Sequence, residues 1–233
     1  MSGLACLVFI AKRFPILRMT PEERRPDSRT CRSLCFMGIP MGLQYSITAI
    51  GSIFLQSAVN SLGSLYVAGV AAGSKLFQLL GCPYDAMGAT MATYCGQNVG
   101  AVKLDRLGKG VRACSLLGLI YALIAFGGML LFAPQGAMLF LDPTEPELAT
   151  LVDLTAQYIR TLTAFFFPLA LVNIVRFSIQ GMGFSGLAIL AGVMEMIART
   201  AVGVIFVPMF GYTAACFASP AAWGRADLSL IHI

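Results

Sequence analysis

Charged residues are scarce in this sequence, because Asp, Glu, Lys and Arg make up 12% of its 233 residues, about half the share in an average soluble domain. Three tracts carry no charge at all: residues 33–74, 113–141 and 200–224. One membrane-spanning helix needs about 20 mainly apolar residues, so each tract can cross a bilayer. This scarcity excludes a soluble globular domain and predicts an all-α integral membrane protein, with the lipid bilayer as its first partner.

Histidine is nearly absent, since His232 is the only one. An intramembrane enzyme needs a nucleophile–base pair or a metal cluster, and the sequence offers neither. The seven cysteines form no Cys-x-x-Cys pair and are expected to pack as small apolar residues between helices. No basic patch interleaves with exposed aromatic residues, which argues against a nucleic-acid partner despite the net charge of +5. We therefore expect no enzyme, no cofactor and no metal.

The apolar segments predict spanning helices at roughly residues 34–60, 66–100, 113–132, 156–181 and 186–208. A last apolar tract begins at Tyr212 and stops early. Together these segments define a transmembrane lobe at residues 34–227.

The two ends of the chain differ from this lobe. Residues 1–11 are apolar but too short to cross a bilayer, so we expect them to end a preceding spanning helix. Residues 12–33 form a basic linker. Residues 228–233 read like a translated transposase sequencing adapter, so we expect an adapter-derived tail and a chain that is a fragment.

The loops predict an orientation. Positive charge gathers in the linker 12–33 and in the loop Lys103–Arg112, whereas the loop Asp142–Asp153 is acidic. Short basic loops stay in the cytoplasm, and an even number of crossings separates the two basic segments. Both should therefore face the cytoplasm and the acidic loop the outside, in a multi-pass protein of the cell (plasma) membrane, most simply a bacterial inner membrane.

Several ionisable residues fall at membrane depth, where each charge costs about 2.5–3.5 kcal/mol or more. Glu195 and Arg199 have the i,i+4 spacing of an ion pair, and we leave open whether they neutralise each other or act in a pathway. Lys75 and Asp85 lie too far apart on one helix to pair, which favours a water-filled cavity. The candidate cavity residues are Gln44, Tyr45, Thr48, Gln56, Lys75, Asp85, Asn173, Arg176, Gln180, Glu195 and Arg199.

Prolines add a second indication of a pathway. Pro40, Pro83 and Pro168 each interrupt a different predicted helix, and each removes a backbone hydrogen bond. Bent helices at mid-membrane are common where transporters bind substrate.

Four short motifs occur in order along the chain. They are Gly-Ile-Pro-Met-Gly-Leu-Gln at 38–44, Cys-Gly-Gln-Asn-Val-Gly-Ala at 95–101, Ser-Ile-Gln-Gly-Met-Gly at 178–183, and Pro-Met-Phe-Gly-Tyr at 208–212 followed by Pro-Ala-Ala-Trp at 220–223. This series resembles the multidrug and toxic-compound extrusion (MATE) family.

The resemblance implies a two-lobe transporter with a central cavity. Each lobe of that family has six helices, so this chain would be the C-terminal lobe: the end of helix 6, helices 7–11 and a truncated helix 12. The missing N-terminal lobe would then be its partner. The implied function is secondary active antiport, exporting organic cations, drugs or toxic metabolites (small amphipathic or cationic compounds) in exchange for Na⁺ or H⁺.

The coupling ion is left open by the same resemblance. Some branches of the family carry a glutamate on helix 7 and an aspartate on helix 10, and these positions fall at about Thr48 and near Leu169, which are not acidic. Other branches place the carboxylate in the first lobe. The alternative function is a channel-like or structural membrane subunit, which we would expect to show a repeated pore-lining ring or filter.

Overall fold

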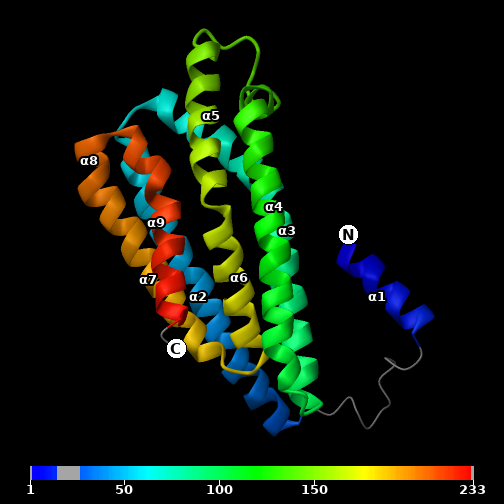
Figure 1. Cartoon of the computed structure of the whole chain (residues 1–233). Helices are drawn as coiled ribbons and strands as arrows, with labels where there is room; N and C mark the ends of the chain where they lie inside the picture. Colours follow the sequence, from blue (N-terminus) through cyan, green and yellow to red (C-terminus); the bar gives the residue numbers. More distant parts are fainter. Residues whose placement is uncertain (1, 15–26, 232–233) are drawn as a thin grey trace. The chain divides into compact units, whose positions relative to one another are not determined.

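The computed structural model describes residues 2–14 and 27–231, and the regular structure in both stretches is helical (Figure 1). The chain divides into two compact units at a point within one helix: Met1–Gly38 and Ile39–Ile233. The first unit holds α1 (Ser2–Arg13) and the opening turns of α2 (Ser28–Asn60). The second holds the rest of α2, followed by α3 (Ser64–Gly100), α4 (Asp105–Met138), α5 (Leu148–Ala164), α6 (Phe166–Gly181), α7 (Ser185–Ala201), η2 (Val202–Phe206), α8 (Val207–Phe210) and α9 (Tyr212–Ile231).

The helices match the predicted membrane spans in number and order. Helices α2, α3, α4 and the continuous segment Ser185–Phe210 are each long and apolar enough to cross a bilayer. Helices α5 and α6 form a further, broken span with a bend of 52°. The predicted all-α integral membrane fold is confirmed.

Several predicted helix boundaries were wrong. Helix α4 begins at Asp105, so most of the predicted basic loop forms its first turns, and α5 begins at Leu148, so Asp153 is helical. Residues 12–13 and 28–33 of the predicted linker also belong to helices, and residues 15–26 lie outside the described residues. Charges mark the end of the apolar span and not the end of the helix, because backbone hydrogen bonding continues into the polar interface.

The last helix is also longer than predicted. Helix α9 runs for 20 residues, from Tyr212 through residues 228–231 of the predicted tail, whereas 232–233 lie outside the described residues. The helical backbone therefore continues past residue 227, where the predicted lobe ends, and the adapter-derived origin of residues 228–233 stays a prediction. Arg225 and Asp227 near its end do not interrupt the helical backbone.

The predicted helix 156–181 is broken at Phe165, whose backbone leaves the helical region with φ −108° and ψ 21°. Pro168 explains the position, since its ring conflicts with the carbonyl four residues earlier, at Ala164. In the first turn of α6 the missing N–H costs little. Pro40, Pro83 and Pro134 instead lie inside continuous helices.

The core of the second unit forms where α3 and α6 cross and where α6 and α7 pack against α9. Tyr84 and Phe166 meet edge to face at 5.3 Å between ring centroids, and Phe77 stacks on Trp223 at 5.8 Å. At the α3–α6 crossing, a Cβ at Gly181 would collide with the carbonyl oxygen of Ala92. This close approach explains why the motif at 178–183 carries a glycine.

Candidate functional site

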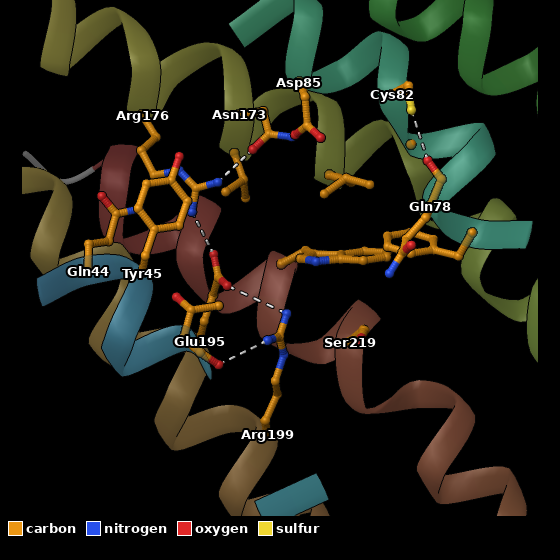
Figure 2. A pocket seen from close by; sticks show the side chains of 16 residues that line it. Gln44, Tyr45, Gln78, Cys82, Asp85, Asn173, Arg176, Glu195, Arg199 and Ser219 are labelled. Atoms are coloured by element: carbon orange, nitrogen blue, oxygen red, sulfur yellow. Dashed lines mark hydrogen bonds and ion pairs between the residues drawn. The ribbon is translucent and has the colours of Figure 1, made fainter. Parts of the chain in front are cut away.

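A cavity of about 390 Å³ lies among α2, α3, α6, α7 and α9, in the second unit (Figure 2). Most of the polar residues predicted from the sequence line it, together with aromatic and small residues. The lining comprises Gln44, Tyr45, Thr48, Phe77, Gln78, Gly81, Cys82, Asp85, Leu169, Val172, Asn173, Arg176, Glu195, Arg199, Ser219 and Trp223. We call this the first cavity.

Three predicted candidates lie elsewhere. Gln180 is buried behind the lining and contacts Gln44, whereas Gln56 lines a neighbouring cavity. Lys75 is exposed and lines neither of these two cavities. Lys75 and Asp85 lie apart on α3, as their ten-residue spacing predicted, and only Asp85 lines the first cavity.

Glu195 is the centre of an ion cluster and is only 3% exposed. Its Oε2 lies 3.6 Å from Arg199 Nη2, which is the predicted i,i+4 pair. Its Oε1 lies 3.1 Å from Arg176 Nη1 on α6, a pairing that the sequence analysis missed (Figure 2). The sequence did contain a signal for this pairing: Arg176 lies in the middle of a span whose helix carries no acidic residue, so its partner had to come from another helix. One carboxylate therefore serves two guanidinium groups and ties α6 to α7.

Arg176 is held on its other sides by amides. Its Nη2 donates to Asn173 Oδ1 at 2.6 Å, one turn away on the same helix. With its side-chain oxygen facing Arg176, the Gln44 amide accepts two hydrogen bonds from that arginine, from Nε at 3.2 Å and from Nη1 at 3.1 Å. The Gln44 amide also lies 2.7 Å from Gln180 Nε2, whereas Gln180 Oε1 has no hydrogen-bond partner among the described residues. Arg176 is thereby fixed in one position.

Arg199 is held more loosely. Its Nη1 donates to Ser52 Oγ at 2.9 Å and, at 3.5 Å, to the Thr48 carbonyl, both on α2. Its Nε is buried and has no hydrogen-bond partner among the described residues. Arg199 therefore keeps unused donor capacity beside the cavity.

Asp85 supplies a carboxylate that the arginines do not neutralise. It lies on α3, two residues after Pro83, and makes no ion pair or side-chain hydrogen bond with any described residue. Thr48 and Leu169, where the resemblance implied carboxylates in some branches, both line the same cavity. Among the residues that the structure describes, no group of His, Cys, Asp and Glu side chains could hold a metal ion.

Arg160 on α5 is a charged residue that the sequence analysis did not single out. Its Nε and Nη2 donate to the carbonyls of Met129 and Leu130 on α4, at 3.3 and 3.1 Å. Pro134 has no N–H for the Leu130 carbonyl, so Arg160 supplies the missing donor. This arginine is outside the first cavity and has a structural role.

Comparison with known proteins gives consistent results. A family model described as MatE matches residues 40–209. A protein of Neisseria meningitidis serogroup B, named probable multidrug resistance protein NorM, is 27% identical over 158 residues, covering 66% of this chain and 34% of that protein. A Bacillus subtilis protein, named probable multidrug resistance protein YpnP, is 32% identical over 77 residues, covering 33% of this chain and 17% of that protein.

Solved structures share the fold. The crystal structure of MATE in complex with MaL6 superposes with a TM-score of 0.86 at 19% identity, over 99% of this chain and 52% of that one. An outward-facing multidrug resistance MATE family transporter of the MOP superfamily gives a TM-score of 0.74 at 20% identity, over 86% of this chain and 44% of that one. The chain thus spans about half the length of these solved structures, and its matches cover 34% and 17% of the two curated relatives. The family model covers most of the chain, and this multi-pass membrane protein belongs to the MatE family, the MATE family that its motifs resemble.

Proposed function

We propose that this chain forms the C-terminal lobe of a secondary antiporter that exports amphipathic organic cations across the plasma membrane in exchange for Na⁺ or H⁺. Asp85 is the residue that meets the positive group of the substrate. The observation that carries this proposal is the unpaired Asp85 carboxylate in a cavity among membrane-spanning helices.

The remaining lining supports an amphipathic substrate. Trp223 and Phe77 stack at 5.8 Å and give the first cavity an aromatic wall. Aromatic faces attract organic cations and also cover their apolar parts. Charged side chains at membrane depth are costly and are kept chiefly where they act on a pathway or pair with one another.

The test uses a complete transporter in which both lobes are present. Cells lacking their own drug exporters are loaded with a fluorescent organic monocation, and its efflux is followed. Asp85→Asn is expected to lower the export rate about tenfold or more, since a charge-assisted contact is worth about 1.5–3 kcal/mol. Asp153→Asn is the matched control, because Asp153 is exposed on α5 and outside the cavity lining, and its export should stay at the level of the unmodified protein.

Gradients distinguish the antiporter from the alternative of a channel-like subunit. The Na⁺ gradient and the H⁺ gradient are collapsed in separate experiments. Export should stop in one of them, and the gradient whose collapse stops export belongs to the coupling ion. Export that survives the collapse of both gradients, or that is equal in Asp85→Asn and the unmodified protein at matched membrane expression, contradicts the proposal.

A further inference from the structure

A second cavity of about 340 Å³ adjoins the first. The two cavities share four lining residues: Phe77, Gln78, Arg199 and Ser219. The second cavity extends from this shared wall along α2 and α3 to Val59 and Val70, away from Asp85. Arg199 therefore borders both cavities.

The polar lining of the second cavity has one sign of charge. Ser52, Ser74, Ser219 and Tyr158 contribute hydroxyl groups, and Gln56 and Gln78 contribute amides. Arg199 is the one charged residue among the described residues that line it. Hydroxyl and amide groups can all donate hydrogen bonds, so this lining can surround an anion.

The ion cluster leaves positive charge beside this cavity. Glu195 contributes one negative charge and is shared by Arg176 and Arg199, so the three side chains sum to +1. The further partners of both arginines are neutral: Asn173 for Arg176, and Ser52 with the Thr48 carbonyl for Arg199. An unbalanced charge at membrane depth is unfavourable, and a bound anion would relieve it. Neither Asp85, which lines only the first cavity, nor Asp227 on α9, a neighbour of Glu195, lines the second cavity.

We propose that the second cavity is a binding site for a monovalent anionic group, which Arg199 holds together with the surrounding hydroxyl groups. The anionic group is either the carboxylate of a transported molecule or a free halide. The carboxylate form rests on the proposed transport function. In that form the preferred substrate is a zwitterion whose ammonium group lies near Asp85 and whose carboxylate lies near Arg199.

Trp223 provides a built-in reporter of occupancy. It is the only tryptophan in the sequence, and it stacks on Phe77, which lines both cavities, with an angle of 15° between the rings. The experiment places the purified chain in nanodiscs of uncharged lipid and titrates it with sodium bromide, a quencher of tryptophan emission. Sodium sulfate, a strongly hydrated dianion, keeps the ionic strength constant. A parallel titration with sodium butyrate follows the shift in emission, and butylammonium sulfate is the cationic control.

A saturable response to bromide identifies a halide site, and a saturable response to butyrate alone identifies a carboxylate site. Butylammonium should reproduce neither response. Arg199→Gln should weaken the apparent affinity about tenfold or more, the size expected when a charged hydrogen-bond partner is lost. The matched control Asp153→Asn should keep the affinity within about twofold of the unmodified chain, since Asp153 is exposed on α5 and lines neither cavity.

The double variant Ser52→Ala with Ser219→Ala covers the case in which Arg199→Gln fails to fold. It removes two hydroxyl donors without changing any charge, and it should also weaken anion binding. Linear, non-saturating responses to both bromide and butyrate would overturn the proposal. An affinity equal to that of the unmodified chain would also overturn it, in Arg199→Gln or, where that variant does not fold, in the double variant. Because this assay requires no transport, its failure is distinguishable from failure of the proposed export function.

Discussion

At the residue scale, the Glu195 cluster holds three helices together. Glu195 contacts Arg176 on α6 and Arg199 on its own helix, and Arg199 in turn donates to Ser52 on α2. A buried ion pair contributes little net stability, whereas removing one partner leaves an uncompensated charge. The cluster is therefore sensitive to single substitutions and tolerant of compensated ones.

Removing the charges of this cluster one after another tests whether the Glu195 carboxylate interacts with both arginines. Glu195→Gln leaves two arginines without their carboxylate and should cost about 3–5 kcal/mol of unfolding free energy. Adding Arg199→Met should recover part of that loss, and adding Arg176→Met as well should recover more, because each step removes an orphaned charge. Denaturant unfolding in mixed micelles measures the series. Equal stability of the single, double and triple variants would show that these side chains do not interact.

The sequence predicted the members of this site better than their contacts. The Glu195–Arg199 pair follows from i,i+4 spacing on one helix, so it could be predicted from the sequence alone. The Arg176–Glu195 contact joins residues 19 positions apart on two helices, and the Gln44–Gln180 contact joins residues 136 positions apart. Such contacts depend on how the helices pack, and helical periodicity contains no information about packing between helices.

At the scale of one helix, prolines explain where the spans bend and what repairs them. Pro168 breaks the span at Phe165, whereas α4 stays continuous through Pro134. The difference is accounted for by Arg160, which donates to the Leu130 carbonyl at 3.1 Å. An unsatisfied carbonyl in lipid is costly, so this donor allows α4 to remain helical.

A double-mutant cycle tests the repair. Arg160→Leu should cost about 1–3 kcal/mol of unfolding free energy, because it leaves the Leu130 carbonyl without a donor. In a Pro134→Ala background the backbone N–H at position 134 returns, so the same arginine substitution should cost clearly less. Pro83→Ala is the control background, since it restores an N–H on α3, far along the chain from Leu130. An equal cost of Arg160→Leu in all three backgrounds would rule out the repair.

The existence of the spans could be predicted, but their ends and the break could not. Long uncharged tracts mark the hydrocarbon region, which is why the predicted spans appear in the predicted order. Helix ends depend on the local backbone, such as the positive φ of 95° at Gly183 that closes the turn between α6 and α7. The break at Phe165 precedes Pro168 by three residues because the steric conflict acts backwards along the helix.

At the scale of the whole molecule, the loops between spans carry opposite charge. The α3–α4 turn is followed by a basic first section of α4, and the α4–α5 loop is acidic. In that acidic loop, hydrogen bonds from the Thr144 backbone N–H and hydroxyl hold the pKa of Asp142 below its usual value. Asp142 therefore stays charged at any physiological pH on the side predicted to face outward.

Cysteine labelling in intact cells tests this orientation on a background without the seven native cysteines. Glu145→Cys lies in the α4–α5 loop and should react with a membrane-impermeant maleimide. Ala101→Cys, exposed in the α3–α4 turn, should react only after the membrane is permeabilised. The reverse pattern would invert the predicted topology.

The central proposal is that this chain forms one lobe of a two-lobe exporter; the chain spans about half the length of the solved MATE structures on which it superposes. The family resemblance implies a cavity between two lobes, of which one lobe would provide only one wall. The most direct measurement is gradient-driven transport of a fluorescent organic cation in everted membrane vesicles, comparing this chain alone with a complete two-lobe reading frame that contains it. The account predicts transport by the two-lobe protein that stops when the coupling gradient collapses, and none above the empty-vector level from this chain at equal membrane expression. Gradient-driven transport by this chain alone, or its absence from the two-lobe protein, would contradict the account.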